Sequence, residues 1–150
     1  MVKNLSIKIL SFAGTVIKYS CIVHCAFNYG GEFYMCIGPS MEPTIHTHDV
    51  LFTEHISPRF DKLSKGDIII AKSPTNPREI ICKRIGGVEG DRIYCGFTSY
   101  VVPQGHLWLE GDNASNSSDS RSYGAIPKGL VISRAVCKVW PFSDITFLNK

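Results

Sequence analysis

Short apolar runs separated by turn-forming residues fill this chain from residue 32 onward. The runs are rich in Ile, Val, Leu and aromatic residues, and they occupy 50–52, 68–71, 80–85, 92–94, 100–102, 106–109 and 130–139. The separators are typical turn sequences, such as 64–67, Gly86-Gly87, 89–91 and 127–129. No amphipathic helix pattern interrupts the series. The sequence therefore predicts a mainly β fold, an antiparallel β-sandwich or barrel-like domain.

Charge is distributed unevenly along the chain. The net charge is only +3, and Lys3, Lys8 and Lys18 all precede the first acidic residue, Glu32. Beyond that point the sequence contains no basic stripe with interleaved aromatic residues, the pattern that nucleic-acid-binding surfaces show. We therefore expect no nucleic-acid partner, and 150 residues suffice for one domain with a modest core.

The segment 5–27 is the candidate for membrane contact. It is about as long as a bilayer-spanning helix, roughly 20 residues, but Lys8, Lys18 and His24 interrupt it. An amphipathic helix on the core and a mitochondrial transit peptide remain alternatives. We favour an N-terminal anchoring helix whose lysines reach toward the headgroups. The expected division is an anchor segment at 1–31 and a β domain at 32–150.

Cysteine and histidine residues do not predict a metal site. The six cysteines include no CxxC pair and match no zinc module, so we expect most of them to be reduced and buried. Strand alternation directs Cys82 to the face opposite Lys83. His46 and His48 fit a solvated loop better than a ligand pair. We expect no metal and no cofactor.

Lys83 is the first candidate catalytic residue. It follows Ile81 by two residues and precedes Ile85 by two, so all three side chains share one face of a strand. Burial disfavours the ammonium form of lysine and lowers its pKa. A lysine that loses its proton near neutral pH can act as a general base.

Ser40 is the second candidate, because a stiff turn presents it. Gly38 and Pro39 precede it, and Met41, Glu42 and Pro43 follow. Serine with lysine is a known nucleophile–base combination. Met41 offers a flexible apolar wall for a small aliphatic group.

The polar segment 111–124 is the third candidate element. Its oxygen donors allow a calcium loop, but the glycine and closing glutamate of an EF-hand are missing. We favour a braced polar loop, in which Asp119 pairs with Arg121 or with backbone groups. The hydroxyl of Ser117 would then form a hydrogen bond with Lys83.

Together these segments resemble the type I signal peptidase family. The resemblance rests on Gly38-Pro39-Ser40-Met41-Glu42-Pro43-Thr44, on Cys82-Lys83-Arg84, and on Gly111-Asp112-Asn113 with Asn116-Ser117 and Asp119-Ser120-Arg121. It covers about residues 36–141. The short length is similar to the mitochondrial inner-membrane branch, as are 66–74, 105–113 and 21–27.

The resemblance implies a membrane-bound serine endopeptidase of the signal-peptidase fold. By it, Ser40 is the nucleophile, Lys83 the general base, and Ser117, Asp119 and Arg121 support the site. Met41 and Gly38 would contact substrate. Gly38 occupies the position where some relatives place a second oxyanion donor, so only the Ser40 N–H is assigned to that role.

The implied setting is the mitochondrial inner membrane, with the catalytic domain facing the intermembrane space. There the enzyme would remove sorting presequences from precursor proteins, in contact with membrane lipid and with a homologous second subunit as a heterodimer. Alternatives are a catalytically silent partner subunit, a bacterial-type signal peptidase I, and a self-cleaving serine/lysine repressor. The last would need a DNA-binding domain, which residues 1–31 do not contain.

Overall fold

The computed structural model describes residues 2–25, 30–96 and 98–148. Its helices and strands are, in chain order, α1 (Val2–Cys25), β1 (Glu32–Met35), β2 (Val50–Glu54), α2 (Ile56–Arg59), β3 (Ile68–Lys72), β4 (Ile80–Gly87), β5 (Arg92–Cys95), β6 (Thr98–Val101), β7 (His106–Glu110), η2 (Ala114–Asn116), α3 (Ser120–Tyr123), β8 (Ile126–Pro127), η3 (Lys128–Leu130), β9 (Val131–Trp140), η4 (Phe142–Asp144) and β10 (Thr146–Phe147). The prefixes α and η denote α- and 3-10 helices. Every predicted apolar run contains a strand.

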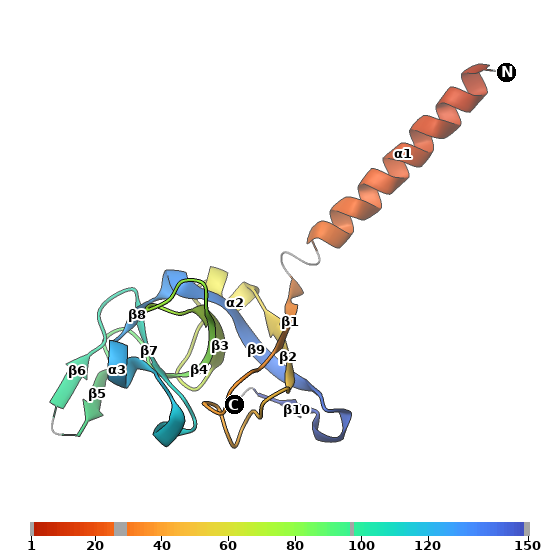
Figure 1. Ribbon diagram of the computed structural model, residues 1–150. Helices are drawn as coiled ribbons and strands as arrows, with labels where there is room; N and C mark the ends of the chain where they lie inside the picture. The colour runs from red at the N-terminus through yellow and green to blue at the C-terminus, as the bar shows by residue number, and fades with distance from the viewer. Residues whose placement is uncertain (1, 26–29, 97, 149–150) are drawn as a thin grey trace.

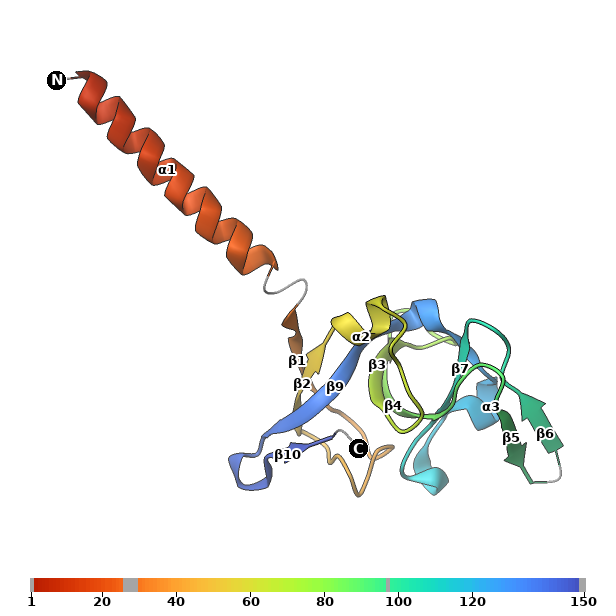
Figure 2. The ribbon, with the colours of Figure 1, turned by 180° about the vertical axis from the view of Figure 1, so that it is seen from behind.

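One antiparallel sheet of eight strands forms most of the molecule (Figure 1). Its order is β1-β2-β9-β3-β4-β7-β8, and β10 pairs with β9. The sheet curves strongly, but its end strands β1 and β8 do not pair with each other, so the described strands form no closed barrel. Strands β5 and β6 form a separate hairpin at one end (Figure 2). The prediction of a mainly β, antiparallel fold is confirmed.

Strand β3 crosses the centre of the sheet and is buried on both faces. Ile69 and Ala71 pack in one apolar cluster with Ile85 of β4. Ile68 belongs to a second cluster, with Met41 from the serine turn. Successive side chains of a strand point to opposite faces, so one apolar run serves both clusters. The core thus reaches directly beneath the turn that carries Ser40.

The prediction of a turn at Gly86-Gly87 is wrong. Both glycines belong to β4, where the register with β7 shifts between Ile85 and Gly87. A Cβ on Gly86 would lie 2.8 Å from Glu110, and one on Gly87 would lie 2.6 Å from Ile93. The two glycines therefore allow close packing at an irregular point of the strand. In the sequence alone, such a glycine pair looks the same as a turn.

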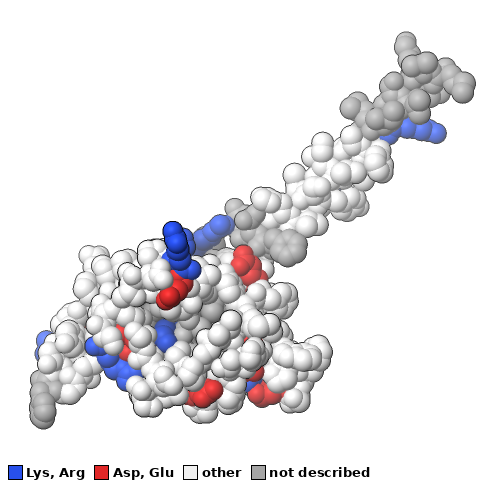
Figure 3. Space-filling view, viewed as in Figure 1, with Lys and Arg blue, Asp and Glu red and all other residues white. Residues whose placement is uncertain are grey.

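Helix α1 extends away from the sheet (Figures 1 and 2). Its described side chains from residue 11 to 25 are exposed, so it does not form the helix packed on the core that was one alternative. The described part of its surface is largely uncharged (Figure 3). The predicted anchor ends at residues 26–27, which lie outside the described residues. Among the helices that are described, none is both long enough and apolar enough to cross a bilayer.

Candidate functional site

A cavity of about 350 Å³ brings four of the predicted site residues together. Ser40, Lys83, Met41 and Gly38 all line it. The remaining wall is mostly apolar and comes from β1, the segment after it, β3 and β4: Tyr34, Met35, Cys36, Ile37, Ile45, Ile70, Ile80, Ile81 and Cys82. The cavity thus joins the serine turn to the lysine strand.

The turn that carries Ser40 is held by its neighbours on both sides. Met41 and Ile45 anchor it in the core, with 3% and 1% of their surface exposed, and the Ile45 amide donates to the Met41 carbonyl at 2.9 Å. From the other side, the Asn113 amide donates to the Ser40 carbonyl at 3.1 Å, and its side-chain nitrogen donates to the Pro39 carbonyl at 3.1 Å. Ser40 is therefore fixed relative to the 111–124 segment.

Lys83 is a buried lysine without an acidic partner. Only 4% of its surface is exposed, and it lies opposite Ile69 of β3. Burial lowers the pKa of Lys83 below its ordinary value, while the charge of Asp119 opposes this shift. No carboxylate in the described part of the chain forms an ion pair with it. The neutral amine form is therefore easier to reach for Lys83 than for an exposed lysine.

Asp119 and Arg121 form an ion pair between a fully buried carboxylate and an exposed guanidinium. The Asp119 side chain is fully buried and accepts hydrogen bonds from Arg121 Nε at 2.8 Å, Arg121 Nη2 at 2.5 Å and the Gly111 amide at 2.9 Å. Burial alone would raise the pKa of Asp119, but these donors and the Ser117 hydroxyl lower it to about 2. Asp119 is therefore ionised, and its charge is already paired with Arg121.

Ser117 does not form the predicted hydrogen bond with Lys83. Its hydroxyl is buried and has no partner with hydrogen-bond geometry, although it lies near enough to Asp119 to lower the pKa of that carboxyl. Ser117 instead packs over Gly111. A Cβ at Gly111 would lie 2.1 Å from Ser117 Oγ and 2.6 Å from the Ser40 carbonyl oxygen. The absence of a side chain at 111 thus lets the loop approach the serine turn.

Arg84 and Asp112 form an ion pair next to Lys83 that the sequence did not predict. Arg84 Nε and Nη2 donate to the two carboxylate oxygens of Asp112 at 2.8 and 2.6 Å, and Nη1 donates to the Gly66 carbonyl at 2.9 Å. Burial raises the pKa of Asp112, but Arg84 and the Thr44 hydroxyl of the serine turn lower it below its ordinary value. Arg84 lies in the motif that contains Lys83, and Asp112 lies in the motif that begins at Gly111, but their spacing in the sequence does not show that they pair.

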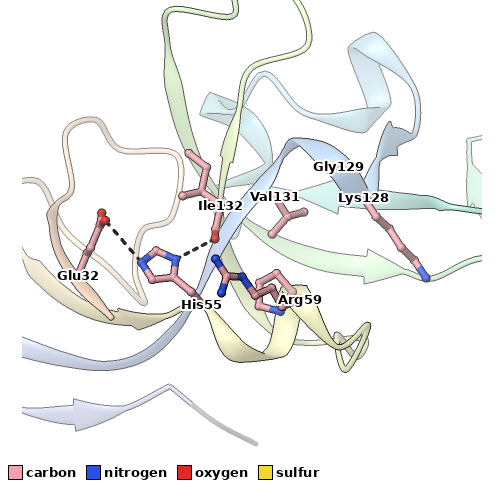
Figure 4. A pocket seen from close by; sticks show the side chains of 8 residues that line it. Glu32, His55, Arg59, Lys128, Gly129, Val131 and Ile132 are labelled. Atoms are coloured by element: carbon pink, nitrogen blue, oxygen red, sulfur yellow. Dashed lines mark hydrogen bonds and ion pairs between the residues drawn. The ribbon is translucent and has the colours of Figure 1, made fainter. Parts of the chain in front are cut away.

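A second cavity, of about 360 Å³, lies on another part of the domain (Figure 4). His55 is central to it: Nε2 lies 3.5 Å from Glu32, and Nδ1 lies 3.1 Å from the Ile132 carbonyl oxygen. Arg59 and Lys128 also line it. It includes neither Ser40 nor Lys83. Its contacts tie the start of β1 to α2 and β9, and so fix where the chain enters the sheet.

Comparison with known proteins shows that this chain is similar to proteins of one peptidase family. A family described as "Signal peptidase, peptidase S26" matches residues 9–98 and 96–140. The mitochondrial inner membrane protease subunit 1 of Mus musculus is 51% identical, over 99% of this chain and 93% of its own. Subunit 2 of the same protease from Saccharomyces cerevisiae is 40% identical, over 80% of this chain and 70% of its own. A crystal structure of a signal peptidase I from Enterococcus faecalis has a TM-score of 0.43 and 23% identity, over 48% of this chain and 95% of that one.

Proposed function

Because this chain belongs to the signal peptidase (peptidase S26) family, we propose that it is a serine endopeptidase in which Ser40 is the nucleophile and Lys83 is the general base. One observation carries the proposal: Lys83 is buried without a carboxylate partner and lines the same cavity as Ser40. A lysine in that state has a lowered pKa and can accept the proton of a nearby hydroxyl.

In the proposed reaction, Ser40 Oγ attacks the carbonyl carbon of the scissile bond while Lys83 Nζ takes the hydroxyl proton. Lys83 then donates that proton to the leaving amine, and water hydrolyses the acyl-enzyme ester. The Ser40 N–H forms no hydrogen bond within the described part of the chain, so it can donate to the oxyanion. Gly38 offers no side-chain donor, and the second donor stays unassigned.

The proposed substrate is an extended polypeptide, the sorting presequence of a precursor protein. The cavity opens between the segment after β1 and the start of β4, where Ile37 and Ile80 line it and are 85% and 55% exposed. An extended chain can pair with such a segment through its backbone. Met41 and Gly38 then limit the space beside the scissile bond, which favours a small side chain.

The proposed setting is the mitochondrial inner membrane, to which the relatives' names refer. Residues 1–31 would attach the protein to that membrane through α1, where Lys8 and Lys18 bound a run without charges. Residues 32–150 would form the peptidase domain and face the intermembrane space. A homologous second subunit would complete a heterodimer, as the names subunit 1 and subunit 2 suggest. Carbonate extraction and protease protection of tagged mitochondria test this placement, and a domain exposed in the matrix would refute it.

Cleavage of a presequence-bearing precursor by the purified full chain tests the chemistry. Ser40→Ala and Lys83→Met should each abolish cleavage while the circular dichroism and the unfolding midpoint stay close to the wild type. Ser118→Ala and Lys72→Met are matched controls, since both side chains are exposed and away from the cavity. Full activity of Lys83→Met would refute the general-base role, and inactive wild type beside an active partner subunit would favour a catalytically silent subunit.

A further inference from the structure

Two cysteine side chains meet in the wall of the Ser40–Lys83 cavity. All six cysteines are free; Cys21 and Cys25 are exposed on α1, contrary to the expectation of burial, and the other four are partly buried. Among these four, Cys36 and Cys82 line the cavity, and the interaction between their thiols lowers the pKa of Cys36 and raises the pKa of Cys82. Both also pack against the apolar cluster that contains Met41.

The backbone on each side of this thiol pair is fixed. The Cys36 amide donates to the Asp49 carbonyl at 2.8 Å, and the His48 amide donates to the Cys36 carbonyl at 2.8 Å. Cys82 lies within β4, opposite Ile70 of β3. The backbones of both residues are therefore fixed, and their side chains share one cavity wall although they are far apart in the sequence.

We propose that Cys36 and Cys82 are a redox modification site, at which a reversible disulfide joins the Ser40 segment to the Lys83 strand and stops cleavage. Cys36 precedes Ser40 by four residues, and Cys82 is adjacent to Lys83. A bond between them would cross-link the two segments between which the proposed substrate lies. The inhibitory part of this proposal rests on the proposed peptidase function, whereas formation of the disulfide does not.

The oxidant would be an external disulfide, written RSSR. The thiolate of Cys36 attacks one sulfur of RSSR, which forms a Cys36–SR mixed disulfide and releases one RS⁻. Cys82 then loses its proton to the released thiolate and attacks the Cys36 sulfur, which releases the second thiolate. In sum, two protein thiols and RSSR give one protein disulfide and two RSH, and the two electrons pass to the external sulfurs.

The order of attack follows from the two thiol environments. The interaction with Cys82 lowers the pKa of Cys36, while the same interaction, followed by burial, raises the pKa of Cys82. Cys36 is thus the thiol that reacts first with an external disulfide, and Cys82 is the resolving thiol. Trapping with a slight excess of a mixed-disulfide reagent should accordingly label Cys36 before Cys82.

The test uses the purified full chain, with glutathione disulfide as the oxidant. After oxidation, free thiols are blocked and the digested protein is examined by mass spectrometry. We expect a peptide pair joined through Cys36 and Cys82, together with at least a tenfold loss of cleavage that dithiothreitol restores. Cys95→Ser is the matched control, since Cys95 lies in the β5–β6 hairpin, and it should respond to oxidation like the wild type.

The variants Cys36→Ser and Cys82→Ser should each keep, under glutathione disulfide, whatever activity they show under dithiothreitol. Inhibition of Cys36→Ser by the oxidant, or an oxidised wild type without the Cys36–Cys82 link, would overturn the proposal.

If these variants do not fold, phenylarsine oxide replaces them, because trivalent arsenic bridges two nearby thiols. Protection of both Cys36 and Cys82 from alkylation supports the pair, and protection of neither refutes it. If the reduced wild type does not cleave the substrate, that result contradicts only the proposed function. Formation of the disulfide is still tested, because the linked peptides are detected by mass spectrometry and not through activity.

Discussion

Arg84 and Asp112 form a bidentate ion pair, with nitrogen–oxygen distances of 2.8 and 2.6 Å. Arg84 follows Lys83 in β4, and Asp112 precedes Asn113, whose amide holds the Ser40 carbonyl. The Asp112 carboxylate therefore connects the lysine strand with the loop that fixes the serine turn. A planar guanidinium paired with a carboxylate fixes orientation as well as distance. This pair is well placed to set the relative position of the two proposed catalytic groups.

We expect Asp112→Asn to slow cleavage without removing either catalytic group. The amide keeps the side chain's shape but cannot accept both guanidinium donors, so the serine turn and β4 lose a shared restraint. A displacement of about 1 Å can cost about a hundredfold in rate, and we expect a fall of about 10- to 100-fold in kcat. Steady-state kinetics on the precursor substrate measure it. Asp61→Asn removes an exposed pairing with Lys128 and is the control; equal kcat values for both variants would contradict this role.

Gly111→Ala should disrupt the site by steric overlap. The added Cβ would lie 2.1 Å from Ser117 Oγ and 2.6 Å from the Ser40 carbonyl oxygen, and backbone cannot move aside cheaply. Overpacking of this kind costs about 1–3 kcal/mol of unfolding free energy, and the displaced Ser40 should lower kcat as well. Urea unfolding and cleavage assays measure the two effects. Gly129→Ala is the matched control, because a Cβ there meets nothing within 4 Å. If both alanine variants behave alike, the close approach has no consequence.

The pH dependence of cleavage should report on Lys83. A general base acts only when it is unprotonated, so kcat/KM should fall as the pH drops below the pKa of Lys83. Burial lowers that pKa, Asp119 raises it and Arg121 lowers it. Asp119→Asn should therefore move the acidic limb of the profile to lower pH, and Arg121→Gln should move it to higher pH. Shifts in the same direction for both variants would contradict this electrostatic account.

Asp119 should also make the stability of the domain sensitive to acid. Its pKa of about 2 in the folded state lies below the value of about 3.9 for an unfolded chain. A depressed folded-state pKa gives stability that is complete above the unfolded value and is lost as the pH falls toward the folded one. The unfolding free energy should consequently decline between about pH 5 and pH 2. In Asp119→Asn this decline should be shallower; an unchanged slope would show that Asp119 is not responsible.

The strands were predictable because their signal is local. Alternation places Lys83 between Ile81 and Ile85 on one face, and the structure has the same arrangement. By contrast, the pairing of Arg84 with Asp112 and the shared cavity wall of Cys36 and Cys82 bring together segments that are distant in the chain. Such pairs depend on how the sheet curves, which no local pattern encodes.

Two mistaken expectations have a common origin. Gly86-Gly87 was taken for a turn, although close packing explains it, and Ser117 was expected to hold Lys83, although it packs over Gly111. In both cases the residue type indicated a special role, but the sequence did not show which residue it contacts. A glycine signals equally a turn or a close approach, and a serine hydroxyl fits many partners. The short strands β1, β8 and β10 were missed because so few residues carry a weak periodic signal.

Among the charged residues beneath the serine turn, Lys138 should be the one whose replacement lowers the unfolding free energy most. It is 3% exposed, and its Nζ lies 3.2 Å from Asp49 and 2.5 Å from Asp144. Asp49 is itself buried and accepts a hydrogen bond from the His46 amide at 2.9 Å. Lys138→Met leaves the Asp49 charge buried without a cation, which costs about 3–5 kcal/mol of unfolding free energy.

Asp144→Asn is the matched comparison, because it removes the other partner of the same ammonium from a side chain that is 55% exposed. Surface charges are well solvated on their own, so this variant should change stability far less. Guanidinium unfolding of the three proteins decides the matter. The expected order is wild type, then Asp144→Asn close behind, then Lys138→Met well below. A loss of unfolding free energy in Asp144→Asn as large as in Lys138→Met would instead show that the surface ion pair with Asp144 is the important one. Asp49 would then not be the residue that links Lys138 to the Ser40 turn.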